Sequence, residues 1–169
     1  MPSLQNTEGL FTLVAASNLE TGKPLQEAQY DAEAGFRKLA ALKPNILTIY
    51  TNQPQAENLL ESGEAAMMSG QFSSYTLIRA AASSPVGLTA LKGGVFAMPS
   101  GMCKVKGDPN EAAADAFIDA YPGPEIQTIL VARSFVLPTN PGTAIPTGFA
   151  QPGDPFVPDW GHVNKNRAA

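Results

Sequence analysis

Apolar residues recur at three- and four-residue spacing in several segments that are separated by glycine and proline. This spacing predicts helices, because residues three and four apart share one helical face. The expected helices run from Asn6 to about Asn18, from Asp31 to Leu42, from Asn52 to Leu60, from Ser73 to about Ser83, from Asp108 to Tyr121 and onwards from Gly123.

Shorter runs of β-branched, aromatic or aliphatic residues alternate with these helices. They predict strands at residues 45–51, 64–68 and 86–91, with further candidates at 95–98 and 102–105. Helices and strands that alternate in this way favour an α/β fold with a mostly parallel sheet flanked by helices. Three strands in the first 92 residues are few for a free-standing sheet of this kind, which indicates that the fold is incomplete.

Polar groups gather where helices are expected to begin. Asn6-Thr7 stands at one expected helix start, and Ser73-Ser74 stands at another. The unpaired N–H groups of a helix N-terminus attract anionic or polar ligand groups. In open α/β sheets, ligands also bind just outside the carboxyl ends of strands, where the turn from Ser69 to Tyr75 is expected to lie. The pattern therefore favours a binding pocket, although each residue is also an ordinary cap or core position.

Length and charge narrow the class of protein. With 169 residues and 44% hydrophobic content, the chain suits one globular domain, or one domain with an appendage. The net charge of −4 argues against a nucleic-acid partner, because nucleic-acid binding needs a clustered basic face. No apolar run is long enough to cross a membrane. The Pro- and Gly-rich end, residues 138–169, is expected to wrap an existing surface.

Enzyme chemistry has little support in the sequence. His162 and Cys103 are the only histidine and the only cysteine, and they stand far apart in the chain. No nucleophile elbow, phosphate-binding loop or zinc-protease motif is present. We therefore predict no catalytic residue, no metal and no cofactor. Two alternatives to a binding protein stay open: an α/β-class enzyme with catalytic residues on loops, and an interaction module without a small ligand.

Several segments, taken in order, resemble the bacterial extracellular solute-binding proteins of ABC transporters, in particular the polyamine- and iron-type group. The segments are NTEGLF, FRKLAALKPNILTIYTNQPQ, LLESGEAAMMSGQFSSY, GDPNEAAADAFIDAYPGPEIQTILV, LPTNPG and PDWGHVNKNRAA. Each motif alone has low specificity, whereas the ordered set covers nearly the whole chain. The resemblance implies a type II periplasmic-binding fold. Its two lobes close on a solute and deliver it to a membrane permease, in the periplasm or outside the cell.

The resemblance also implies that the chain is partial, with an incomplete first lobe. Residues 1–92 would form most of the second lobe, residues 93–137 the crossover strand and helices of the first lobe, and residues 138–169 a wrapping tail. Apolar surface left without its partner tends to be covered by another chain. We therefore expect a homo-oligomer.

The ligand-binding residues that the resemblance implies are Asn6, Thr7, Glu8, Gln71, Phe72, Ser73, Tyr75, Met98 and Ser100. Polyamine-type members often carry an acid on the crossover strand, where this chain has Pro99-Ser100, which counts against a polyamine. Iron-type members use a close pair of tyrosines, and the tyrosines here are isolated in sequence. A small polar organic solute is expected instead: an amine, an amino-acid-like molecule, a carboxylate or a phosphonate.

Overall fold

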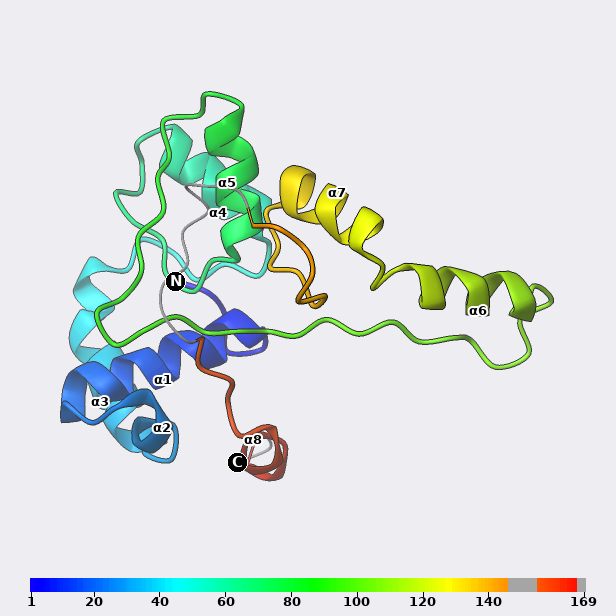
Figure 1. Ribbon diagram of the computed structural model, residues 1–169. Helices are drawn as coiled ribbons and strands as arrows, with labels where there is room; N and C mark the ends of the chain where they lie inside the picture. The colour runs from blue at the N-terminus through cyan, green and yellow to red at the C-terminus, as the bar shows by residue number, and fades with distance from the viewer. Residues whose placement is uncertain (146–154, 167–169) are drawn as a thin grey trace.

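The computed structural model describes residues 1–145 and 155–166, and their regular structure is helical (Figure 1). The helices are α1 (Thr7–Thr21), α2 (Leu25–Ala28), α3 (Ala32–Leu42), α4 (Gln53–Glu61), α5 (Ser73–Ala81), α6 (Glu111–Ala120), α7 (Pro124–Ser134) and α8 (Trp160–Asn166), with a 3-10 turn η1 (Lys43–Asn45) after α3. The predicted helices are therefore confirmed, with ends that differ by a few residues.

Local capping explains why α4 lies where the sequence predicts it. The Asn52 side chain accepts a hydrogen bond of 3.3 Å from the Gln55 N–H, and Pro54 occupies the first turn. Such a cap satisfies one of the N–H groups that the first turn leaves without an intrahelical partner. Gly63 follows the helix with φ of +77°, a left-handed conformation that costs glycine little.

The predicted parallel sheet is wrong. The described residues form only three isolated bridges: Pro2 with Tyr50, Leu91 with Gly94, and Phe96 with Phe156. The segment 45–51 has strand-like composition, but among residues 1–145 and 155–166 its main-chain hydrogen bonds to another segment go to residues 1–3 alone. Its Leu47 and Ile49 consequently stay more than 60% exposed. A strand is stabilised by cross-strand neighbours rather than by its own composition, and those neighbours are missing here.

The apolar core lies in the body of the molecule, which we define as residues 1–94. Helix α1 packs on α3 closely enough that a Cβ on Gly35 would stand 2.6 Å from the Leu13 carbonyl oxygen. Val14 and Leu25 form a buried cluster with Phe156, which comes from the C-terminal segment. Residues far apart in the sequence therefore complete one core.

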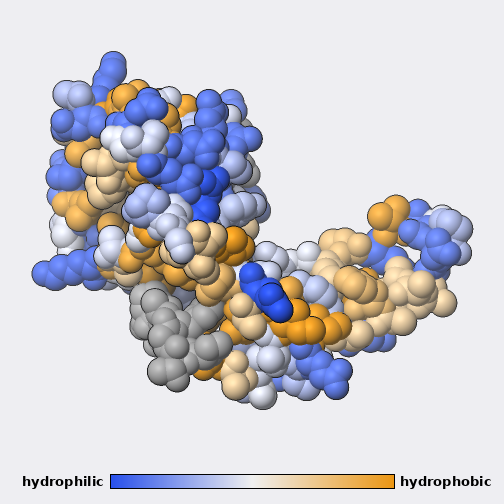
Figure 2. Space-filling view, turned by 90° about the horizontal axis from the view of Figure 1, so that it is seen from above, coloured by the Kyte–Doolittle hydropathy of each residue, from blue (hydrophilic) through white to orange (hydrophobic). Residues whose placement is uncertain are grey.

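A second region leaves this body as an arm, which we define as residues 98–121. A crossing segment (residues 95–108) runs outward in extended form, and α6 and α7 lead back towards α5 (Figure 1). No residue of α6 is buried. Figure 2 shows apolar residues along this arm and where it joins the body. Within the described part of the chain, no helix has the length and apolar character needed to cross a membrane.

Candidate functional site

The start of α1 is tied to the start of α4 by side chains. Asn6 donates from Nδ2 to the Thr51 carbonyl oxygen at 3.1 Å. Glu8, only 8% exposed, accepts from Nε2 of Gln53 at 2.7 Å. An acid in the first turn also suits the positive end of the helix dipole. The first turn of α1, with Thr7 as its first residue, is therefore held against α4 by a buried amide–carboxylate contact.

The turn after residue 68 passes directly across this first turn. A Cβ on Gly70 would stand 2.7 Å from both the Glu8 carbonyl oxygen and the Thr12 hydroxyl oxygen. Gly70 also has φ of +67°. The Tyr50 hydroxyl donates to the Ser69 carbonyl oxygen at 2.9 Å. Glycine is thus needed at position 70 for both close approach and backbone conformation.

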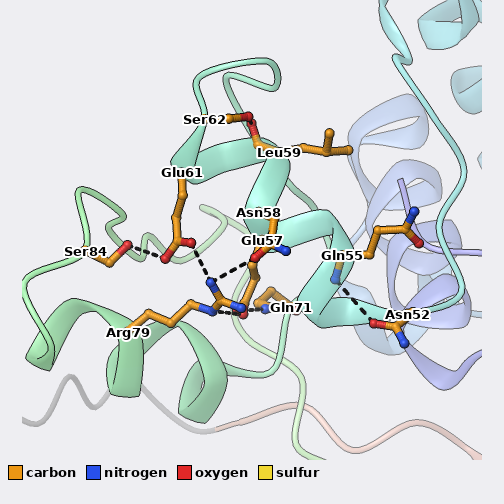
Figure 3. Close-up of polar contacts among 10 residues, drawn as sticks. All are labelled: Asn52, Gln55, Glu57, Asn58, Leu59, Glu61, Ser62, Gln71, Arg79 and Ser84. Atoms are coloured by element: carbon orange, nitrogen blue, oxygen red, sulfur yellow. Dashed lines mark hydrogen bonds and ion pairs between the residues drawn. The ribbon is translucent and has the colours of Figure 1, made fainter.

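A polar network joins the end of this turn to α4 and α5 (Figure 3). Gln71 donates from Nε2 to Glu57, whose side chain is 2% exposed. Nε of Arg79 lies 2.5 Å from the other Glu57 carboxylate oxygen, and its Nη1 lies 2.6 Å from Glu61. Ser84 donates to Glu61 at 2.6 Å. Arg79 therefore forms ion pairs with two acids on α4, one of them buried.

The hydrogen bonds within this network shift the pKa values of the groups at its exposed end. Donation from Ser84, and then from Arg79, lowers the pKa of the Glu61 carboxyl. The hydrogen bond to Glu61 raises the pKa of Arg79. Both groups therefore stay charged through the neutral range.

Tyr50 is influenced by both groups of contacts, because the charges of Glu8 and Glu57 both act on its hydroxyl. Burial raises the pKa of its hydroxyl well above the usual value, and the charges of Glu8 and Glu57 raise it further. The hydroxyl is therefore protonated at neutral pH and serves as a donor to Ser69. The two buried acids lie near enough to one tyrosine for both to act on it.

The structure brings part of the predicted site together. Asn6, Thr7 and Glu8 lie beside the turn that leads to Gln71, through the contacts at Gly70. Phe72 is partly buried where it precedes α5, and Ser73 and Tyr75 are exposed on the first turn of that helix. These seven residues come from the start of α1 and from the 71–75 segment.

Met98 and Ser100 do not join the other predicted residues. Both lie exposed on the crossing segment, which leads away from the body (Figure 1). Within the described part of the chain, no hydrogen bond or ion pair connects either of them to the other predicted residues.

Sequence reasoning missed Tyr50, Gln53, Glu57 and Arg79. One signal was available: Gln53, Ala56 and Glu57 are spaced at three and four residues, so two polar side chains share a helical face with a buried alanine. Polar residues on a buried face need partners, which marks them as members of a network.

Two open hollows lie elsewhere. One of about 440 Å³ is lined by Met1, Leu39, Ala40, Lys43 and residues 46–49. The other, of about 280 Å³, lies between the crossing segment and α6, where Met102 and Val105 face Phe117. Neither is lined by any predicted binding residue.

The arrangement suits recognition by hydrogen bonds and charge rather than covalent chemistry. Ser73 and Tyr75 carry exposed hydroxyl groups, the carboxylate-bearing Glu8 is buried, and the amide-bearing Gln71 is partly buried. Cys103 is exposed on the arm and His162 lies in α8, so neither joins this site. Among residues 1–145 and 155–166, no group of three or more His, Cys, Asp or Glu side chains is arranged to hold a metal ion.

A site of this kind is suited to noncovalent binding. Residues 5–155 match the family described as bacterial extracellular solute-binding protein, and the chain belongs to that family. Its general role is therefore that of the extracellular solute-binding component of a transporter, and proteins of this family are generally not enzymes. The family match does not extend to the polyamine- or iron-type group. No curated protein and no solved structure matches the chain.

Proposed function

We propose that this protein captures a small polar organic solute and delivers it to the membrane permease of an ABC importer. The observation that carries the proposal is the convergence of the first turn of α1 with the 71–75 segment, within a chain of the solute-binding family. The two segments lie far apart in the sequence, and between them they supply amide, carboxylate and hydroxyl groups.

The proposed site combines buried and exposed polar groups. Glu8 is buried, Asn6 and Gln71 are partly buried, and Ser73 and Tyr75 are exposed. Buried groups with fixed partners orient a ligand because they do not have to be ordered when it binds. Thr7 and Phe72 complete this half of the site, and Met98 and Ser100 would approach from the crossing segment when the protein closes on its solute.

Charge narrows the proposed class of solute. Glu57 has the cationic partner Arg79, whereas Glu8 is hydrogen bonded to the neutral amide of Gln53. The site therefore carries excess negative charge, which repels anions. Neutral polar solutes and amines are favoured over carboxylates and phosphonates.

We also propose that the chain associates with itself. A compact monomer of 17.7 kDa has a surface of about 7,900 Å², whereas this chain exposes 11117 Å². The exposed Val105 and Phe117 of the arm are the kind of surface that association covers. Sedimentation velocity across a hundredfold range of concentration tests this: a rising sedimentation coefficient supports it, and a constant monomer contradicts it.

Ligand binding is tested by a thermal-shift screen against neutral polar solutes, amines, carboxylates and phosphonates, followed by calorimetric titration of the hits. We expect Ser73→Ala and Tyr75→Phe each to weaken binding of a hit about tenfold, because each removes one hydroxyl from the proposed site. The matched controls are Ser134→Ala and Tyr121→Phe, which make the same chemical changes away from it. Equal affinity in all four variants would contradict this placement of the site.

A further inference from the structure

The C-terminal segment 155–162, which we call the strap, returns to the body and pairs with the crossing segment. The Phe156 N–H donates to the Val95 carbonyl oxygen at 2.8 Å, and the Ala97 N–H donates to the Phe156 carbonyl oxygen at 2.8 Å. These bonds form a parallel bridge. The strap therefore provides main-chain partners at the point where the crossing segment leaves the body.

Aromatic rings reinforce this junction. Phe96, on the crossing segment, stacks on Phe11 of α1 with ring centres 4.7 Å apart. The Phe156 ring meets Phe96 edge to face at 5.5 Å and is itself buried against Val14 and Leu25. Phe96 thus contacts one ring from the body and one from the strap. Such pairs contribute beyond the area that they bury.

A polar contact anchors the other end of the strap. The Tyr30 hydroxyl donates to one oxygen of Asp159 at 3.0 Å, and the Asp159 N–H donates to Oε1 of Gln29 at 2.8 Å. The second Asp159 oxygen accepts from the His162 N–H at 3.0 Å, while the His162 ring lies edge-on to Tyr30 at 4.8 Å. The His162 N–H, followed by Tyr30, lowers the pKa of Asp159, so it accepts as a carboxylate.

We propose that the strap is a latch: when its Asp159 anchor releases, the crossing segment loses its main-chain partner and the arm is freed from this side of the body. The structural reason is that the Val95 carbonyl oxygen and the Ala97 N–H are both hydrogen bonded to Phe156. The inference does not depend on the proposed function.

Hydrogen exchange at single amides tests the latch, because the Ala97 N–H is bonded to the strap itself. We expect exchange at Ala97 to rise about three- to tenfold in Tyr30→Phe and further in Asp159→Ala, since weaker anchoring raises the population of the open form. The Ala56 amide in α4, which is bonded to the Asn52 carbonyl oxygen, is the internal reference and should keep its rate. Tyr121→Phe, which removes a tyrosine hydroxyl outside the latch, should change neither rate.

Two results would overturn the proposal. The first is an unchanged rate at Ala97 in both latch variants, which would mean that the anchor does not hold the crossing segment. The second is an equal rise at Ala97 and Ala56, which would mean that the substitutions loosen the whole body. Tyr30→Phe removes a single exposed hydroxyl, so its folded state can be compared directly with the unsubstituted protein.

Discussion

The body and the arm both contain helices with apolar residues, but these residues differ in how far they are buried. In the body, α1 buries Phe11 and Val14, and even its Glu8 is enclosed and hydrogen bonded. In the arm, α6 buries none of its residues, although Phe117 and Ile118 give it an apolar face. An amphipathic pattern thus specifies which side of a helix seeks burial, whereas a neighbouring element is needed for burial to occur.

The largest expected difference concerns two phenylalanines. Phe11 is 6% exposed and Phe117 is 59% exposed. Phe11→Ala should lower the free energy of unfolding by about 3–4 kcal/mol, because it removes buried surface and leaves a cavity. Phe117→Ala should lower it by less than about 1 kcal/mol, because its ring is largely in water already. Urea unfolding followed by circular dichroism measures both, and equal losses would contradict the comparison.

Two ion pairs give the next largest difference. Arg79→Ala leaves the buried carboxylate of Glu57 without its cation and should cost about 2–3 kcal/mol. Lys104→Ala removes the cation beside Asp115, a pair on the surface of the arm, and should cost less than about 1 kcal/mol. The same unfolding experiment in low and high salt provides a check. A loss for Lys104→Ala as large as that for Arg79→Ala would show that the arm is buried in solution.

Two glycines sharpen the comparison at the backbone. Gly70→Ala should cost about 2 kcal/mol or more, because φ is +67° and the new methyl group would meet the Glu8 carbonyl oxygen. Gly101→Ala, in the crossing segment, has open space around its Cβ and should change stability by less than about 0.5 kcal/mol. Thermal melting of both variants tests this. If Gly70→Ala were as stable as Gly101→Ala, the close approach of the 69–71 turn to α1 would be contradicted.

The smallest expected effect is a pH dependence in the body. The pKa of Glu61 is lowered in the folded state, so its contacts stabilise the protein above the ordinary glutamate pKa. That contribution is lost as the pH falls from about 4.5 through the lowered folded-state pKa. Ser84→Ala should therefore melt at a lower temperature than the unsubstituted protein at pH 7, with a gap that narrows towards pH 3. Ser134→Ala serves as the control. If the difference in melting temperature widened on acidification, the lowered pKa assigned to Glu61 would be contradicted.

Much of the helical structure could be predicted because its signals are local. Asn52 and Pro54 place the start of α4, and Gly63 places its end, without help from any distant residue. The sheet could not be predicted in the same way. Residues 45–51 have the composition of a strand, but within the described part of the chain only residues 1–3 pair with them. Composition reports what a segment favours when a partner is present, and it does not supply the partner.

The candidate site was likewise predictable only in part. Polar side chains at the helix start near Asn6 and in the turn that ends at Tyr75 were recognisable from their positions, and the structure places the two segments together. The network of Glu57 and Arg79 was not recognised, because its donors and acceptors lie 22 positions apart and become partners only when α4 meets α5. Met98 and Ser100 were predicted from a family resemblance, and their contribution to binding stays a prediction.

The sequence by itself determined six of the helices, the start and end of α4, and the family of this protein. These properties depend on residues that are close in the chain or on the order of segments along it. Only the tertiary structure decided which apolar faces are covered, which buried acid receives a cation, and that Phe156 completes a core begun by Val14. The physical reason is that burial and ion pairing are properties of two surfaces in contact, and a linear pattern describes one surface at a time.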